Sequence, residues 1–146
     1  MFQKESMGLE AAVQGAEAVL AAVGPSEPPI AVAVTDENGE LVYALRMDLA
    51  GPNEVRQAIR KAYTAAFIGR DTSGFHDQLL ADGRTVADWA DPMVTTLPGG
   101  VAIRHRGQVV GAVGVSGGGP ARDDGLAAIG LAAAAPWQAD PVDNRH

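Results

Sequence analysis

The residues best suited to chemistry in this sequence are a lysine, an aspartate and a histidine near its middle. Lys61 lies in a helical pattern, and a lysine removed from water has a lowered pKa and can act as a base or form an imine. Asp48 or His76 could then exchange a proton with a small acid held by Arg46. This set predicts a cofactor-independent isomerase, lyase or hydrolase. The competing interpretation is that Lys61 extends from the core edge to water, which is the usual fate of such a lysine.

His76 is also a candidate axial ligand for haem. A noncovalent haem needs a flat apolar slot, an axial donor and cations for its propionates. His105 is expected in a turn between two arginines and His146 is the last residue, which leaves His76, beside Phe75, as the ligand. The alternative is that His76 is a solvated or hydrogen-bonded structural histidine. The cations that could pair with the propionates are Arg46, Lys61 and Arg70.

Two glycine-rich segments predict turns where another group comes close. At Gly99-Gly100, the small residues could bring a substrate carbonyl near backbone amides, or they could only form a bend. The run Ser116-Gly117-Gly118-Gly119 follows a predicted strand and precedes a predicted helix, which is the geometry of an anion cradle. Asp123 and Asp124 would repel a phosphate there. Their charge favours a tight strand-to-helix crossing with a carboxylate cap.

Composition excludes several classes of protein. The 146 residues suffice for one domain, and a hydrophobic content of 47% indicates a folded core. With 11 basic and 18 acidic residues, the net charge of −7 argues against a nucleic-acid partner. The chain has no cysteine and no paired histidines at zinc-ligand spacing. The apolar stretches are too short to span a bilayer and the N-terminus lacks a secretory pattern, so we expect a cytoplasmic protein with no membrane partner.

The elements that would position these residues follow from hydrophobic periodicity. Apolar spacing predicts helices over 8–23, from the N-cap Asn53 to Gly69, and over about 122–135. The segment 70–92 is irregular, with a short helix through Phe75 and a turn capped by Thr85. The predicted strands are 30–35, 40–47, 93–97, 101–104 and 108–115, the first two joined at Asn38-Gly39.

This order predicts an α+β fold. Hairpins predominate, so we expect a five-stranded, mostly antiparallel sheet with helices packed on its faces. One domain should cover 1–146, with a core over about 8–135 and a tail at 136–146.

An ordered set of short segments runs between Leu9 and Ala134. It comprises Ile30–Asp36 with Gly39, Arg46-Met47-Asp48, Arg60–Phe67 with Gly69-Arg70 and Thr72-Ser73, Gly99-Gly100, Gly111–Gly117 and Asp123-Asp124. In this order the segments resemble the GlcG/HbpS family of haem-binding and haem-degrading proteins. The resemblance implies a profilin-like sandwich, homo-oligomers, and a pocket near the glycine turn and the second helix. Phe75-His76, Trp89 and Val101-Ala102-Ile103 depart from the family pattern where a ligand would be contacted.

The leading prediction is a small-molecule-binding protein whose single cavity holds haem or a smaller carboxylated molecule. The alternatives are the cofactor-independent enzyme acting on a small acid and a non-catalytic partner subunit. The ligand-binding residues of this prediction are Arg46, Thr64, Phe67, Arg70, Trp89, Gly99, Gly100, Ser116 and Gly117. The catalytic candidates are Lys61, Asp48 and His76, and the candidate ligand to haem iron is His76.

Overall fold

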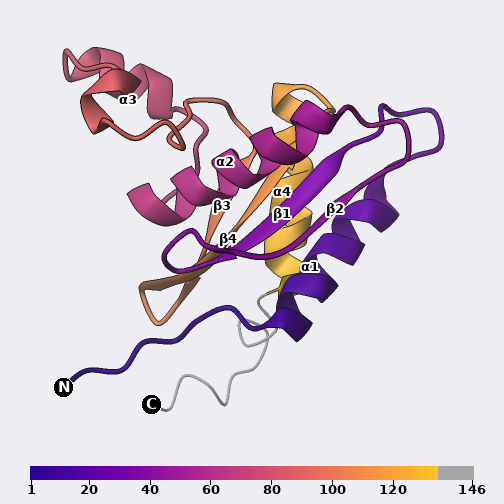
Figure 1. Cartoon of the computed structure of the whole chain (residues 1–146), viewed down its shortest axis with the longest axis horizontal. Coiled ribbons are helices and arrows are strands. Elements are labelled where there is room, and N and C mark those ends of the chain that lie inside the picture. The colour runs from indigo at the N-terminus through magenta and orange to yellow at the C-terminus, as the bar shows by residue number, and fades with distance from the viewer. Residues whose placement is uncertain (135–146) are drawn as a thin grey trace.

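The computed structural model describes residues 1–134, which form an α+β fold around an antiparallel sheet (Figure 1). The strands are β1 (Ala31–Asp36), β2 (Leu41–Arg46), β3 (Gly100–His105) and β4 (Gln108–Ser116), in the spatial order β2-β1-β4-β3. The helices are α1 (Leu9–Ala22), α2 (Pro52–Ile68), α3 (Phe75–Ala81) and α4 (Pro120–Ala134), with a 3₁₀ turn η1 (Val86–Trp89). The predicted tail at 136–146 lies outside the described residues.

The sheet has four strands within the described part of the chain, so the fifth strand predicted at 93–97 is wrong. This segment pairs with α2 instead of a strand. The backbone N–H of Thr95 donates to Thr64 Oγ1 at 2.9 Å, and Arg60 Nη2 donates to the carbonyl of Val94 at 3.1 Å. Strand propensity reports packing against a neighbouring strand, and none lies beside this segment to complete the pairing.

The hairpin between β1 and β2 forms at the predicted Asn38-Gly39 turn. Asp36 Oδ1 accepts hydrogen bonds from the backbone N–H groups of Asn38 at 2.9 Å and Glu40 at 3.0 Å. Gly39 has φ +82°, a conformation that glycine adopts without steric cost. The antiparallel register pairs Ala33 with Ala44 and Val34 with Tyr43. Local turn chemistry therefore decided this element, as the sequence predicted.

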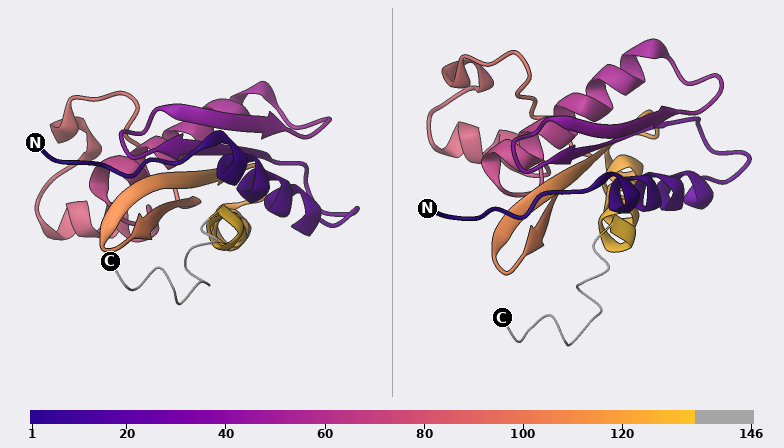
Figure 2. Two further views of the ribbon diagram at one scale, coloured as in Figure 1. Left: turned by 90° about the horizontal axis from the view of Figure 1, so that it is seen from below. Right: turned by 60° about the horizontal axis from the view of Figure 1, so that its bottom comes forward.

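The two faces of the sheet carry side chains of different size. On one face, most of the valines of β1 and β4 pack with apolar residues of α1 and α4, among them Val19 and Leu126. On the other face, Ala31 and Ala33 pack against Ala58 of α2. Figure 2 shows α2 on one side of the sheet and the pair α1 and α4 on the other. Small residues on the second face let the backbone of α2 approach the strands closely.

The helix ends agree with the sequence in most places. Gly69 ends α2 in the left-handed conformation with φ +75°, and Thr85 forms a capping box with Asp88 at η1. The predicted N-cap Asn53 is wrong, because α2 begins at Pro52 with Gly51 as its N-cap. None of the described helices is long and apolar enough to cross a membrane.

Between α2 and β3 the chain leaves the sandwich in an excursion, defined here as residues 70–98. It contains α3 and η1 and stands beside the C-terminal part of α2, away from the sheet (Figures 1 and 2). The excursion is the part of the described chain whose shape the sequence predicted least, and together with the C-terminal end of α2 it lines a pocket.

Candidate functional site

Lys61 lies inside the structure and does not reach water. It is 4% exposed, and its ammonium donates to the carbonyl of Val115 at 2.9 Å and to Asp123 Oδ2 at 3.1 Å. The expected extension of Lys61 to solvent is therefore wrong. The carboxylate of Asp123 is buried as well, so the two charges compensate each other in a place that excludes water. This ion pair fixes α2 to β4 and α4.

The two glycine-rich turns are filled by groups of the chain itself. The Gly99 N–H donates to Asp124 Oδ1 at 2.7 Å, and the Gly118 N–H donates to Asp123 Oδ1 at 2.8 Å. The Gly100 N–H donates to the hydroxyl of Thr72 at 3.0 Å. These amides already have acceptors within the chain. The second turn is therefore the tight strand-to-helix crossing capped by carboxylates, and it does not form an anion cradle. We call this region the glycine junction: Lys61, Gly99-Gly100, Ser116-Gly117-Gly118 and Asp123-Asp124.

Ser116 and Gly117 also make close contacts within the chain instead of facing a ligand site. The hydroxyl of Ser116 donates to Glu54 Oε2 at 2.6 Å. A Cβ on Gly117 would lie 2.7 Å from the carbonyl oxygen of Pro29, and one on Gly100 would lie 2.3 Å from the carbonyl oxygen of Lys61. Glycine is required at both positions because backbone occupies the space that a side chain would need.

The structure distributes the other predicted residues over separate places. Arg46 and Asp48 line a pocket with Leu45 and Met47 near α1. His76 is exposed on α3 and lines a different pocket of about 350 Å³ with Thr96 and Leu97. Thr64 is buried and holds the backbone of Thr95. The single cavity predicted from the sequence, with Arg46, Lys61 and His76 together, is not formed.

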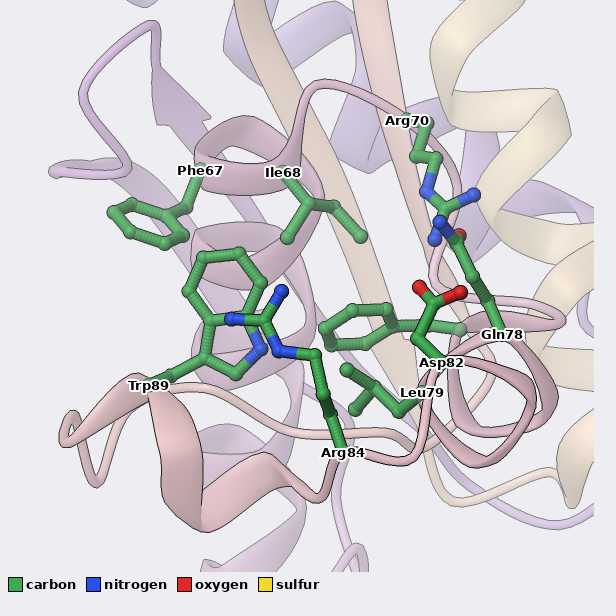
Figure 3. Close-up of a pocket in the computed structure, with 9 residues that line it drawn as sticks. Phe67, Ile68, Arg70, Gln78, Leu79, Asp82, Arg84 and Trp89 are labelled. Carbon is green, nitrogen blue, oxygen red and sulfur yellow. The ribbon is translucent and has the colours of Figure 1, made fainter.

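Three predicted residues do meet, in a pocket between α2 and the excursion (Figure 3). Phe67, Arg70 and Trp89 line this aromatic pocket, an open hollow of about 440 Å³. The remaining lining residues are Ile68, Phe75, Gln78, Leu79, Asp82 and Arg84. The pocket thus combines an apolar wall with two arginines. It is within the size range in which proteins hold small molecules.

The ring of Trp89 meets each of the other two aromatic rings of the pocket edge-on. Trp89 meets Phe67 with ring centroids 5.3 Å apart and Phe75 at 6.1 Å, both in edge-on arrangements. Phe75 is 2% exposed, whereas Phe67 is 49% exposed. The wall is therefore rooted in a small apolar cluster and still presents ring surface to a ligand.

Both arginines of the pocket lie over aromatic rings. The Arg70 guanidinium is 5.7 Å from the centre of the Phe75 ring, and that of Arg84 is 5.8 Å from the centre of Trp89. Both residues are exposed. Such guanidinium groups can pair with a carboxylate through two parallel hydrogen bonds.

Polar contacts from α2 hold the excursion, and with it the pocket, in place. Arg60 Nε donates to the carbonyl of Pro92 at 3.2 Å, and the Tyr63 hydroxyl donates to the carboxylate of Asp91. This hydrogen bond raises the pKa of Tyr63 and lowers the pKa of Asp91, because the carboxylate is stabilised in its charged form and the phenol in its neutral form.

Sequence reasoning missed Arg84 and Leu79 in the aromatic pocket and gave Phe75 no role beyond its place beside His76. A compositional signal was available. The chain has seven aromatic residues, namely three Phe, two Tyr and two Trp, and four of them lie between residues 63 and 89. This clustering around an irregular segment indicates an aromatic site, but no periodicity in the segment predicts which side chains converge.

The aromatic pocket fits part of a haem group. Its rings and arginines suit the porphyrin plane and the propionates, but it offers no imidazole, thioether or phenolate among its lining residues. Of the described imidazoles, His76 lines the separate pocket and His105 contacts Glu5. The residues present therefore fit the organic part of a porphyrin and do not fit its iron.

Residues 7–132 match the family model described as "Haem degrading protein HbpS-like". The chain is 40% identical to "Protein GlcG" of Escherichia coli K12 over 87 residues, which cover 60% of this chain and 63% of GlcG. The alignment thus spans a little under two thirds of that relative.

Two solved structures share the fold. A double mutant of HbpS from Streptomyces reticuli superposes with a TM-score of 0.82 at 32% identity, covering 90% of this chain and 89% of that one. A PduOC:heme complex superposes with a TM-score of 0.77 at 24% identity, covering 88% and 94%. At 24% identity, the similarity to the PduOC:heme complex shows a shared fold and nothing about function.

Proposed function

The chain belongs to the HbpS-like family, and from that premise we propose that it binds a planar, carboxylated small molecule of the haem class in the aromatic pocket. The observation that carries this proposal is the convergence of Phe67, Phe75 and Trp89 with two exposed arginines around one hollow of about 440 Å³. Aromatic walls bind a flat ring and guanidinium groups bind its carboxylates. The family description supports a haem-like ligand.

The proposal concerns the ring and carboxylates of the ligand, because the pocket does not fit the iron. Arg70 and Arg84 lie in different loops of the excursion and would each hold a carboxylate at the edge of the ring. His76 marks a competing location for the ligand, since it lies in the separate pocket beside Leu97. An experiment can separate the two locations.

The enzyme alternative loses its central residue. The ammonium of Lys61 is 4% exposed and is held by Val115 and Asp123, and Asp48 lies in a different pocket from His76. A base must reach the proton that it abstracts within hydrogen-bond distance. We therefore favour binding.

The test is a titration with two ligands, haemin and iron-free protoporphyrin IX. We expect saturable changes in absorbance with both, and affinities that fall roughly tenfold for Arg70→Met and for Arg84→Met, the loss of one charge-assisted hydrogen-bond pair. Arg56→Met is the matched control, since Arg56 is an exposed arginine of α2 outside the pocket. His76→Ala should leave both titrations unchanged. Binding of haemin alone, abolished by His76→Ala, would place the site in the other pocket and refute ours.

We also propose that the chain assembles with copies of itself, as the family resemblance implies. Leu49 is 97% exposed and has φ +71°, and it follows the pocket residues Met47 and Asp48. The exposed Leu20 of α1 lines that pocket with Leu45 and Met47, and apolar side chains gathered at one place on a surface mark contacts with other proteins. Light scattering should give a mass above the 15.0 kDa of one chain, and Leu49→Asp should lower it. A monomer at all concentrations would contradict the proposal.

A further inference from the structure

We infer that the indole N–H of Trp89 is a specificity-determining donor that binds a carboxylate oxygen of the ligand, and that Arg84 covers it until the ligand arrives. The inference rests on the proposed function of the aromatic pocket and adds how the pocket distinguishes an acid from a neutral ring.

The first observation is an orphaned polar atom. Trp89 Nε1 is buried and has no hydrogen-bond acceptor among the described residues. The amides of the glycine junction, in contrast, donate to Asp123, Asp124 and Thr72. A buried donor without an acceptor is unfavourable, and a ligand oxygen that accepts its hydrogen bond removes that cost. Since Trp89 lines the pocket, the pocket is where such an oxygen can come from.

The second observation is the side chain that lies over the indole. The guanidinium of Arg84 is 5.8 Å from the centre of the Trp89 ring, and the residue is exposed (Figure 3). A cation over an aromatic face at an exposed site is weakly held, and the arginine stem has several rotatable bonds. An arriving carboxylate can therefore draw the guanidinium off the ring and occupy the place beside Nε1.

The third observation is the distribution of charge in the pocket. Asp82 lies on the same side as Arg70 and Gln78 in Figure 3, whereas Arg84 projects toward Trp89. A ligand carboxylate held by Arg70 also meets the like charge of Asp82, whereas one held by Arg84 does not, so the Arg84 position is the more favourable of the two. The geometry therefore assigns the first carboxylate to the Arg84 and Trp89 end. The matching ligand is a flat aromatic ring with an anionic oxygen at its edge.

The test compares protoporphyrin IX with its dimethyl ester, which has the same ring without the two negative charges. Trp89→Phe should weaken binding of the acid by roughly tenfold more than binding of the ester, the loss expected for one hydrogen bond to a charged group. Because Arg84 would pair with the carboxylate on its own account, the readout that keeps the test valid if Trp89→Phe fails to fold is the indole signal of the intact Trp89.

A spectroscopic readout separates a hydrogen bond from lost ring contact. In a Trp137→Phe background, Trp89 gives the one indole N–H signal in an NMR spectrum of ¹⁵N-labelled protein. Both ligands shift this signal through the porphyrin ring, so the difference between the two complexes reports the carboxylate. We expect the acid complex to have the more downfield indole proton.

Equal indole positions in the two complexes, with equal losses of affinity in Trp89→Phe, would overturn this inference and leave the proposed function intact. Failure of both porphyrins to bind the unsubstituted protein would instead overturn the proposed function.

Discussion

The glycine junction and the aromatic pocket both lie against α2, yet they treat their polar groups in opposite ways. In the junction, Lys61 and Asp123 are buried and paired, and the glycine amides donate to side chains. In the pocket, Arg70 and Arg84 are exposed over aromatic rings, and Trp89 Nε1 has no acceptor among the described residues. In this protein, closely packed glycines therefore mark contact between backbones, whereas polar groups without a partner in the chain mark a place for a ligand.

The largest effect should come from adding one methyl group in the sheet face below α2. A Cβ on Gly114 would lie 2.1 Å from the carbonyl oxygen of Ala58 and 2.6 Å from the amide of Ala62. We expect Gly114→Ala to lower the free energy of unfolding by more than about 4 kcal/mol, because α2 must move away from the sheet. Denaturant unfolding measures this loss.

Gly125→Ala is the matched control. Nothing lies within 4 Å of a Cβ at that position of α4, and alanine favours the helix by about 1 kcal/mol over glycine. Equal stabilities of the two variants would show that the close contact between α2 and β4 is not rigid.

The second effect is the removal of one charge from the junction. Lys61→Met leaves the buried Asp123 without its cation, and we expect a loss of about 3 kcal/mol in the free energy of unfolding. The double variant Lys61→Met with Asp123→Leu should recover part of that stability, because it buries no charge. The folded fraction of Lys61→Met should bind porphyrin normally. If Lys61→Met lost porphyrin binding while its free energy of unfolding stayed unchanged, Lys61 would belong to the binding site.

The third prediction tests whether the arginines of the aromatic pocket contribute to binding without contributing to stability. Combining Arg70→Met with Arg84→Met should change the free energy of unfolding by less than about 0.5 kcal/mol, because both side chains are exposed. The same variant should bind protoporphyrin IX at least tenfold more weakly, since the carboxylates lose their cations. A large loss of stability would mean that these arginines hold the excursion together and would erase the contrast between the two regions.

The smallest effect concerns pH and the attachment of the excursion. The pKa of Asp91 is lowered below its ordinary 3.8, so its contribution to stability is present above that value and is lost as the pH falls through the lower, folded-state pKa. The pKa of Tyr63 is raised above its ordinary 10.0, so its contribution is present below pH 10 and is lost as the pH rises further.

The protection factors of the excursion's amides, which remove the intrinsic pH dependence of hydrogen exchange, should therefore fall at both pH extremes and stay constant between them. Tyr63→Phe should remove the alkaline fall and weaken the acid one, since the phenol is absent and Asp91 loses its partner. A Tyr63→Phe profile identical to that of the unsubstituted protein would show that this hydrogen bond does not hold the excursion.

Much of the fold could be predicted from the sequence because it depends on local chemistry. The Asn38-Gly39 turn, the left-handed end of α2 at Gly69 and the cap at Thr85 each follow from residues within one or two turns of chain. The fifth strand at 93–97 could not be decided locally. Its residues favour a strand, but the hydrogen bonds of Thr95 and Val94 go to Thr64 and Arg60 of α2, about 30 residues away.

The candidate site divides in the same way. Phe67 and Arg70 were predicted from segments that resemble the family and Trp89 from its departure from the family pattern, and the structure brings all three together. Arg84 was missed because an exposed arginine in a loop has no pattern that distinguishes it. Lys61 was expected at the surface because a lone lysine in a helix extends to water unless a carboxylate meets it, and Asp123 lies 62 residues further along the chain.

The sequence by itself determined where helices, turns and small-residue strands form, since these depend on steric and hydrogen-bonding preferences that act over a few residues. Only the tertiary structure decided which charges are paired and which remain available. That outcome depends on the burial of each group, and burial is set by which distant segments pack together. Asp123 pairs with Lys61, so the charges of the glycine junction are satisfied within the chain. The indole N–H of Trp89 has no acceptor among the described residues, so the aromatic pocket can still bind a ligand through it.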